Sequence, residues 1–218
     1  MKQRQRHVYL IGIMGCGKST VGRFLAEQMH TLFIDLDEWI VKQQGCSVSE
    51  IFENKGETHW RELEGQGLRT LSQRRQPIVM ATGGGIVLRA ENIRRMRQTG
   101  VVVWLDRPLD EIIESIDISK RPLLKDGRDR LTAIFEQRKE RYAQAANMRF
   151  VNKYNNAKRT AELLERQLKR RKKRLAEAAQ KRWRDKQNKK NARRQQRTST
   201  ARHPGNPNKN QPTEKMDG

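Results

Sequence analysis

One nine-residue stretch near the start of the chain, GIMGCGKST at residues 12–20, constrains the fold more than any other part of the sequence. It follows the apolar residues 8–11 and matches the pattern G-x-x-x-x-G-K-[ST]. In this pattern a buried strand leads through a glycine-rich loop into a helix, and backbone N–H groups of the loop point at phosphate oxygens. A glycine-rich turn without a ligand is the alternative. The complete pattern directly after an apolar run favours nucleotide binding.

Short apolar runs alternate with helical stretches along the rest of the first 150 residues. We expect strands at residues 7–11, 32–34, 78–81, 101–105 and 148–151. Helices are expected at 18–29, at 38–75 with breaks near Gly45 and Gly56, and at 90–98, 109–116 and 130–145. Strands that alternate with helices predict an α/β fold with a parallel sheet covered on both faces.

Charge is distributed unevenly along the chain. Residues 153–218 hold 22 Lys and Arg against 6 Asp and Glu, a net charge of +16, so only +6 of the total of +22 falls on residues 1–152. The apolar stripe of Ala161, Leu164 and Leu168 is the last one that could dock on a sheet. We therefore expect one domain over residues 1–168 and a basic, low-complexity tail over 169–218, disordered or partly helical.

The tail has two interpretations. It can be a solvated extension, or it can make weak, sequence-independent contacts with nucleic-acid phosphates. No apolar run approaches the ~20 residues that span a bilayer, and Cys16 and Cys46 provide no framework of disulfides. No signal peptide fits before the first strand. A cytoplasmic monomer without membrane contact is expected.

Two aspartates follow the second expected strand. Asp35 and Asp37 are two residues apart, so both side chains should project from one face of that strand, at the edge where an open parallel sheet binds its ligand. One carboxylate can hold Mg²⁺ through its water shell, and the other can orient an attacking hydroxyl. Asp37 as a helix N-cap is the alternative. After a phosphate loop, we favour the functional interpretation.

Glycines and arginines complete the candidate site. The third strand ends in Thr82-Gly83-Gly84-Gly85, which lets a small ligand lie against the backbone or forms a simple turn. Arg61 lies in the helical region after the aspartates, Arg121 in a polar loop at 117–129 that is typical of a mobile lid, and Arg138 on the next helix. Guanidinium groups bind carboxylates and phosphates with two parallel hydrogen bonds.

Taken together and in this order, these stretches resemble those of the shikimate kinase family. The resemblance covers about residues 7–168 and is carried by GIMGCGKSTVGRFLA, FIDLDEWI, GCSVSEIFENKGETHWRELE, ATGGGIVL, VVVWLD, KRPLL and FEQRKERYAQAA. It implies a phosphate-loop kinase fold of the nucleoside-monophosphate-kinase type, with a five-stranded parallel sheet and a lid. It also implies ATP-dependent phosphorylation of the shikimate 3-hydroxyl, with Mg²⁺ as cofactor, on the route to chorismate and the aromatic amino acids.

The resemblance further implies a role for each matching residue. Those implied to hold ATP are Gly15, Cys16, Gly17, Lys18, Ser19, Thr20 and Arg121. Ser19 and Asp35 would hold Mg²⁺. Shikimate would be bound by Asp37, Arg61, Gly83, Gly84 and Arg138, and Lys18, Asp37 and Arg121 would act in catalysis.

The chain departs from the family pattern in three places, and two rival functions remain open. Residues 111–117 lack the arginine that many members carry near the adenine, Trp60 stands where phenylalanine is usual, and Cys16 replaces a small residue. One rival is a kinase of another acceptor such as gluconate, which the three glycines and the paired arginines disfavour. The other is a nucleic-acid-binding protein on a kinase scaffold that has lost its activity. The intact residues that disfavour it are Lys18, Ser19, Asp35, Asp37 and Arg121.

Overall fold

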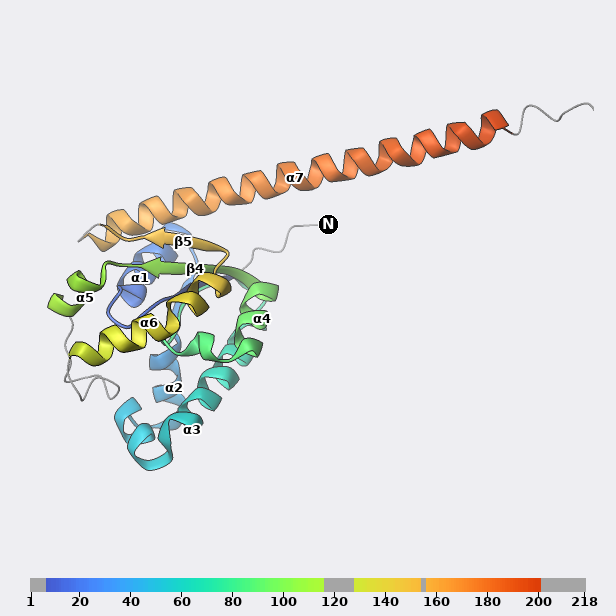
Figure 1. Ribbon diagram of the computed structural model, residues 1–218. Helices are drawn as coiled ribbons and strands as arrows, with labels where there is room; N and C mark the ends of the chain where they lie inside the picture. Colours follow the sequence, from blue (N-terminus) through green and yellow to red (C-terminus); the bar gives the residue numbers. More distant parts are fainter. Residues whose placement is uncertain (1–6, 116–127, 154–155, 201–218) are drawn as a thin grey trace, which may run out of the picture. The chain divides into compact units, whose positions relative to one another are not determined.

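The computed structural model describes residues 7–115, 128–153 and 156–200, with side chains up to residue 191 except that of Arg128. The elements, in chain order, are β1 (His7–Ile11), α1 (Lys18–Gln28), β2 (Leu32–Asp35), α2 (Leu36–Gln44), α3 (Val48–Leu71), β3 (Ile78–Ala81), the 3-10 turn η1 (Ile86–Leu88), α4 (Ala90–Thr99), β4 (Gly100–Asp106), α5 (Leu109–Ser115), α6 (Arg128–Ala145), β5 (Met148–Val151) and α7 (Ala157–Thr200) (Figure 1).

The five strands form one parallel sheet in the order β2-β3-β1-β4-β5. The central strand β1 pairs with β3 through Leu10 and Ala81 and with β4 through Ile11 and Trp104. The parallel sheet expected from the sequence is therefore confirmed. Because all strands run the same way, their carboxyl ends meet at one edge, where β2 ends in Asp35 and the phosphate loop and the three glycines follow their strands.

Helices cover both faces of this sheet. Neighbouring residues of a strand point to opposite faces, and Tyr9 and Leu10 of β1 show what lies on each. The Tyr9 hydroxyl lies 2.7 Å from the Thr99 hydroxyl at the end of α4. Leu10 instead faces α1, where a Cβ on Gly22 would lie 3.1 Å from its side chain. The interior between sheet and helices is apolar, since Tyr9, Leu10 and Ile11 are fully buried.

The chain divides into two compact units between Leu168 and Lys169. The first unit includes the beginning of α7, where Ala161 and Leu164 are fully buried. The second unit, taken by itself, continues α7, and its side chains at 169–191 are exposed except for the half-buried Arg171. None of the helices in the described parts of the chain has the length and apolar character needed to cross a membrane.

Candidate active site

The phosphate loop packs directly on the end of β4. Gly12 has a φ of +141°, and a Cβ at this position would lie 2.6 Å from the Leu105 carbonyl oxygen. No other residue fits there without displacing backbone. The Lys18 ammonium donates hydrogen bonds to the carbonyl oxygens of Gly12 and Ile13, both at 2.9 Å. The loop therefore holds the positive charge of Lys18 against its own backbone.

The remaining loop residues surround this lysine and the helix start. Gly17 caps the N-terminus of α1 and Thr20 is exposed in the first turn of that helix. The Cys16 side chain is fully buried, and its Sγ lies 3.8 Å from Lys18 Nζ. Burial raises the pKa of the Cys16 thiol, although the charge of Lys18 opposes this effect. Cys16 is thus a packed, neutral thiol beneath the loop.

Ser19 and Asp35 meet at the start of α1. The Ser19 hydroxyl donates to Asp35 Oδ2 at 2.5 Å. Mg²⁺ prefers hard oxygen ligands and keeps several waters when one or two side chains and substrate phosphates hold it. A hydroxyl and a carboxylate side by side, next to the phosphate loop, fit such an ion.

The expectation that Asp35 and Asp37 project from the same strand is wrong. Strand β2 ends at Asp35, and Asp37 lies in the first turn of α2. Asp35 is the N-cap of this helix, because its Oδ1 accepts hydrogen bonds from the backbone N–H groups of Asp37 and Glu38 at 3.0 and 3.4 Å. The sequence had suggested Asp37 as the alternative cap. Capping by Asp35 instead fixes the direction in which the chain carries Asp37 into the site.

Charged side chains crowd against the glycines after β3. A Cβ on Gly83 would lie 2.2 Å from Glu64 Oε1 and 2.8 Å from Asp37 Oδ1, and a Cβ on Gly85 would lie 2.1 Å from the Arg61 guanidinium carbon. Gly84 also adjoins the phosphate loop, since its Cβ would lie 3.5 Å from the Gly12 carbonyl oxygen. The turn therefore joins the region of Arg61 and Asp37 to the loop that carries Lys18.

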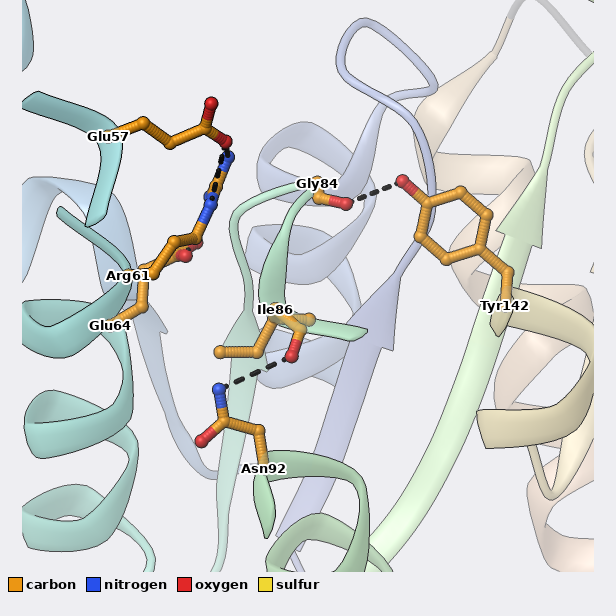
Figure 2. Close-up of polar contacts among 7 residues, drawn as sticks. All are labelled: Glu57, Arg61, Glu64, Gly84, Ile86, Asn92 and Tyr142. Carbon is orange, nitrogen blue, oxygen red and sulfur yellow. Dashed lines mark hydrogen bonds and ion pairs between the residues drawn. The ribbon is translucent and has the colours of Figure 1, made fainter. Parts of the chain in front are cut away.

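Arg61 is held by two carboxylates of its own helix, as Figure 2 shows. Its Nη1 donates to Glu64 Oε2 at 2.7 Å, whereas Nε and Nη2 both donate to Glu57 Oε1 at 3.1 and 2.6 Å. Burial lowers the pKa of Arg61, but Glu64 and Glu57 outweigh it and raise the pKa above its usual value. The guanidinium is therefore fixed and charged.

Arg138 lies on α6, where its charge acts on Glu64 and on Tyr142. Its side chain is buried, and the described residues include no hydrogen-bond partner for its Nε or Nη1. Burial raises the pKa of Glu64, while the charges of Arg61 and Arg138 lower it. A buried guanidinium with N–H groups to spare, beside a second arginine, is suited to bind a carboxylate that arrives with a ligand.

One turn further along α6, Tyr142 fixes the position of the glycine turn. Its hydroxyl donates to the Gly84 carbonyl oxygen at 2.6 Å, while Asn92 Nδ2 donates to the Ile86 carbonyl oxygen at 3.3 Å (Figure 2). Burial raises the pKa of Tyr142, against the charge of Arg138, so the hydroxyl stays protonated as a donor. Both ends of the turn are thereby held.

Sequence reasoning did not single out Glu57, Glu64 or Tyr142. The signal for the two glutamates was present, because they lie four residues before and three residues after Arg61, the spacing at which helical side chains meet. Tyr142 likewise follows Arg138 by four residues. Arg121 and the expected lid at 117–129 lie outside the described residues, apart from the first residues of α6.

A family model described as shikimate kinase matches residues 14–169 of the chain. The chain is 43% identical over 141 residues to a shikimate kinase from Persephonella marina, an alignment that covers 64% of this chain and 85% of that protein. It is 37% identical over 167 residues to a shikimate kinase from a Sulfurihydrogenibium species, covering 76% of this chain and 99% of the relative.

Solved structures give the same result. A shikimate kinase from Acinetobacter baumannii in complex with shikimate superposes with a TM-score of 0.73 at 32% identity, covering 77% of this chain and 95% of that one. A shikimate kinase from Aquifex aeolicus gives a TM-score of 0.66 at 34% identity, with 75% and 96% covered. The similarity extends over nearly the full length of both solved chains.

Proposed function

The chain belongs to the shikimate kinase family and phosphorylates shikimate with ATP, and we propose that Lys18, Asp37 and Arg138 are central to this reaction. The observation that carries these residue roles is a pair of buried arginines whose charges both act on Glu64: Arg61 lies against Gly85, and Arg138 has N–H groups without a partner among the described residues. A carboxylate held there places the rest of the acceptor along the glycine turn, which leads to the phosphate loop.

In the proposed mechanism, Arg138 and Arg61 bind the shikimate carboxylate, and Gly83 and Gly84 leave room for the ring. Asp37, which lies against Gly83, orients the 3-hydroxyl. As the hydroxyl oxygen bonds to the γ-phosphorus and the bond to the ADP oxygen breaks, Asp37 accepts the hydroxyl proton. Lys18 exchanges its carbonyl partners for phosphate oxygens and stabilises the charge on the migrating group.

Mg²⁺ is proposed as the cofactor, held by Ser19 and Asp35 together with waters and the ATP phosphates. When bound, it neutralises charge on the phosphates. The rest of the proposed ATP site is the backbone of Gly15, Cys16 and Gly17, with Thr20 at the start of α1. Loop N–H groups and the positive end of that helix both favour the anion.

The test is a coupled assay of ADP release. Purified protein with ATP and Mg²⁺ should release ADP much faster with shikimate than without it, and gluconate should not replace shikimate. Asp37→Asn should lower kcat, and Arg138→Ala should chiefly raise KM for shikimate. Near-normal kinetic constants in both variants would refute the residue assignments while leaving the activity itself intact.

Arg121 is proposed to close over the phosphates from a lid at 117–129, where exclusion of water would limit wasteful hydrolysis of ATP. Hydrogen exchange of this segment, followed by mass spectrometry, should slow when both ATP-analogue and shikimate are present. Unchanged exchange would count against a lid.

We propose that the enzyme is a cytoplasmic monomer. A second function, binding of nucleic acid, is proposed for its tail. Residues 169–191 of α7 carry 12 Lys and Arg against 2 Asp and Glu, a net charge of +10. Their side chains are exposed, apart from the half-buried Arg171. Exposed basic side chains bind phosphate backbones by releasing counterions. The exposed Leu175 and Trp183 are too few to form the apolar face of a membrane-surface helix, which favours nucleic acid as the partner.

A further inference from the structure

The Arg61 guanidinium is enclosed on three sides. Gly85 lies against the guanidinium so closely that a Cβ on this glycine would come within 2.1 Å of Arg61 Cζ and Nη1. Nη1 is bound by Glu64, whose side chain is only 1% exposed. The third side, formed by Nε and Nη2, is bound by Glu57, whose side chain is 45% exposed. Of the two carboxylates that bind Arg61, Glu57 is therefore the one that solvent, and a ligand arriving from it, can reach.

Glu57 makes poor use of this side. Nε and Nη2 form a fork that matches the two oxygens of a carboxylate in two parallel hydrogen bonds. Glu57 offers one oxygen, Oε1, to both donors. A ligand carboxylate in the same place could give each donor its own oxygen, so it can replace Glu57 with a gain in hydrogen bonding.

Addition of a third carboxylate without exchange is electrostatically unfavourable. Glu57 and Glu64 already lie within 2.7 Å of Arg61. A further negative charge beside them would be repelled by both at close range. Glu57 is partly exposed and follows the helix kink at Gly56, which has a φ of 77° and ψ of 172°. Its side chain can therefore turn into solvent when a ligand arrives.

We propose that Glu57 is an internal competitor of the acceptor, a carboxylate that occupies Arg61 until the carboxylate of shikimate displaces it. This inference rests on the proposed role of Arg61 in shikimate binding. Glu57 lowers the affinity for shikimate by stabilising the ligand-free arrangement. It also keeps the buried Arg61 charge neutralised when no acceptor is present, so the chain tolerates a binding site made of two buried arginines.

The expected effect is modest because the pair is partly exposed to solvent. Exposed ion pairs contribute about 0.2–1 kcal/mol, which corresponds to an affinity change of at most about fivefold. Glu57→Gln keeps the size and the acceptor oxygen but removes the charge. It should therefore lower the Kd for shikimate by up to about fivefold.

Four measurements test the competition in the full-length protein. Calorimetry should give tighter shikimate binding for Glu57→Gln, whereas Glu62→Gln, a matched variant on the same helix whose carboxylate is 50% exposed and pairs with Arg89, should bind like the wild type. In an Arg61→Gln background, Glu57→Gln should have no effect. With shikimate methyl ester, in which the carboxylate is masked, the gain should also vanish.

A different role for Glu57 predicts the opposite change in the affinity for shikimate. If Glu57 positions Arg61 for the acceptor, Glu57→Gln weakens shikimate binding, and the competition is wrong. If Glu57→Gln raises the affinity equally in the Arg61→Gln background, Glu57 acts only by repelling shikimate at a distance. That result would also overturn the competition. If Arg61→Gln alone leaves shikimate binding unchanged, the proposed carboxylate site itself fails, and that result is distinguishable from failure of the competition.

Discussion

Lys18 is the residue whose chemistry is most directly tied to its contacts. Its ammonium is held by the Gly12 and Ile13 carbonyl oxygens at the centre of the loop, where its charge is already oriented before phosphoryl transfer begins. Lys18→Ala should lower kcat by a factor of about 10²–10³, the usual cost of removing one such stabilising group. Steady-state kinetics against Lys42→Ala as a control would check this. A kcat within a few fold of the wild type would contradict the assignment.

A second prediction for a single residue concerns Gly85, the third glycine after β3. In Gly85→Ala the new methyl group would occupy the space of the Arg61 guanidinium, which must then leave Glu64 or tilt away from the turn. We expect a KM for shikimate raised by about tenfold or more, the effect of about 1.4 kcal/mol of lost binding energy, while the affinity for ATP and the far-UV circular dichroism spectrum stay unchanged. An unchanged KM would show that the guanidinium can shift without loss of acceptor binding.

At the scale of the elements, His7 links β1 to β3 and to the end of α3, outside the active site. Its contacts predict that the stability of the protein depends on pH. His7 on β1 accepts a hydrogen bond at Nδ1 from the Ile78 N–H of β3 (3.3 Å), and its Nε2 lies 3.2 Å from the Ser72 carbonyl oxygen at the end of α3. These contacts require the neutral ring with its proton on Nε2. Burial lowers the pKa of His7, the bond to Ser72 raises it, and Arg74 lowers it further.

Because the folded pKa lies below the unfolded value of 6.5, the folded state resists protonation of His7. The contribution of His7 to stability is therefore complete above about pH 6.5 and declines as the pH falls below it, by at most about 1.4 kcal/mol per pH unit for one proton. Urea unfolding between pH 8 and pH 5 should show this decline in the wild type and less of it in His7→Gln. Parallel pH profiles would rule out His7 as its source.

The elements also show what the sequence could and could not predict. Every strand of the sheet was predicted within two residues of its ends, since buried parallel strands are short apolar runs bounded by loops. Asp37 was wrongly placed on the strand with Asp35, because residue spacing does not reveal which aspartate caps the next helix. The pairing of Glu64 with Arg61 was open to prediction from their spacing of three residues, but its burial and the nearby charge of Arg138, 74 positions away in the chain, were not.

At the scale of the whole molecule, kinase chemistry and charge lie in different parts of the chain. The residues assigned to the site precede Leu168, and the second unit begins at Lys169. Truncation after Arg171 should therefore leave kcat and KM for shikimate within about twofold of the full-length values. A folded but inactive truncated protein would show that the tail is part of the kinase.

The full-length and truncated proteins can also be compared for retention of DNA and RNA across a salt series. If the tail binds phosphates, only the full-length protein should bind, without sequence preference, and log K should fall linearly with log salt at a slope of about −0.9 for each phosphate neutralised on B-DNA. Because residues 169–191 hold 12 Lys and Arg, this part of the tail can neutralise at most 12 phosphates. Absence of binding at low salt would leave a solvated extension.

Gly83 and Gly85 bear on the order in which mutations would accumulate in a gene for this enzyme once the enzyme is no longer needed. In the described part of the chain, the glycines with positive φ include Gly12 but neither Gly83 nor Gly85. Backbone geometry therefore fixes Gly12, whereas the side chains of Glu64, Asp37 and Arg61, which form the proposed acceptor site, fix Gly83 and Gly85. In a lineage that obtains aromatic amino acids from its surroundings, selection against misfolding would outlast selection for catalysis. Substitutions would then accumulate at Gly83 and Gly85 first, and the order of loss among related genomes would date the end of the need for the enzyme.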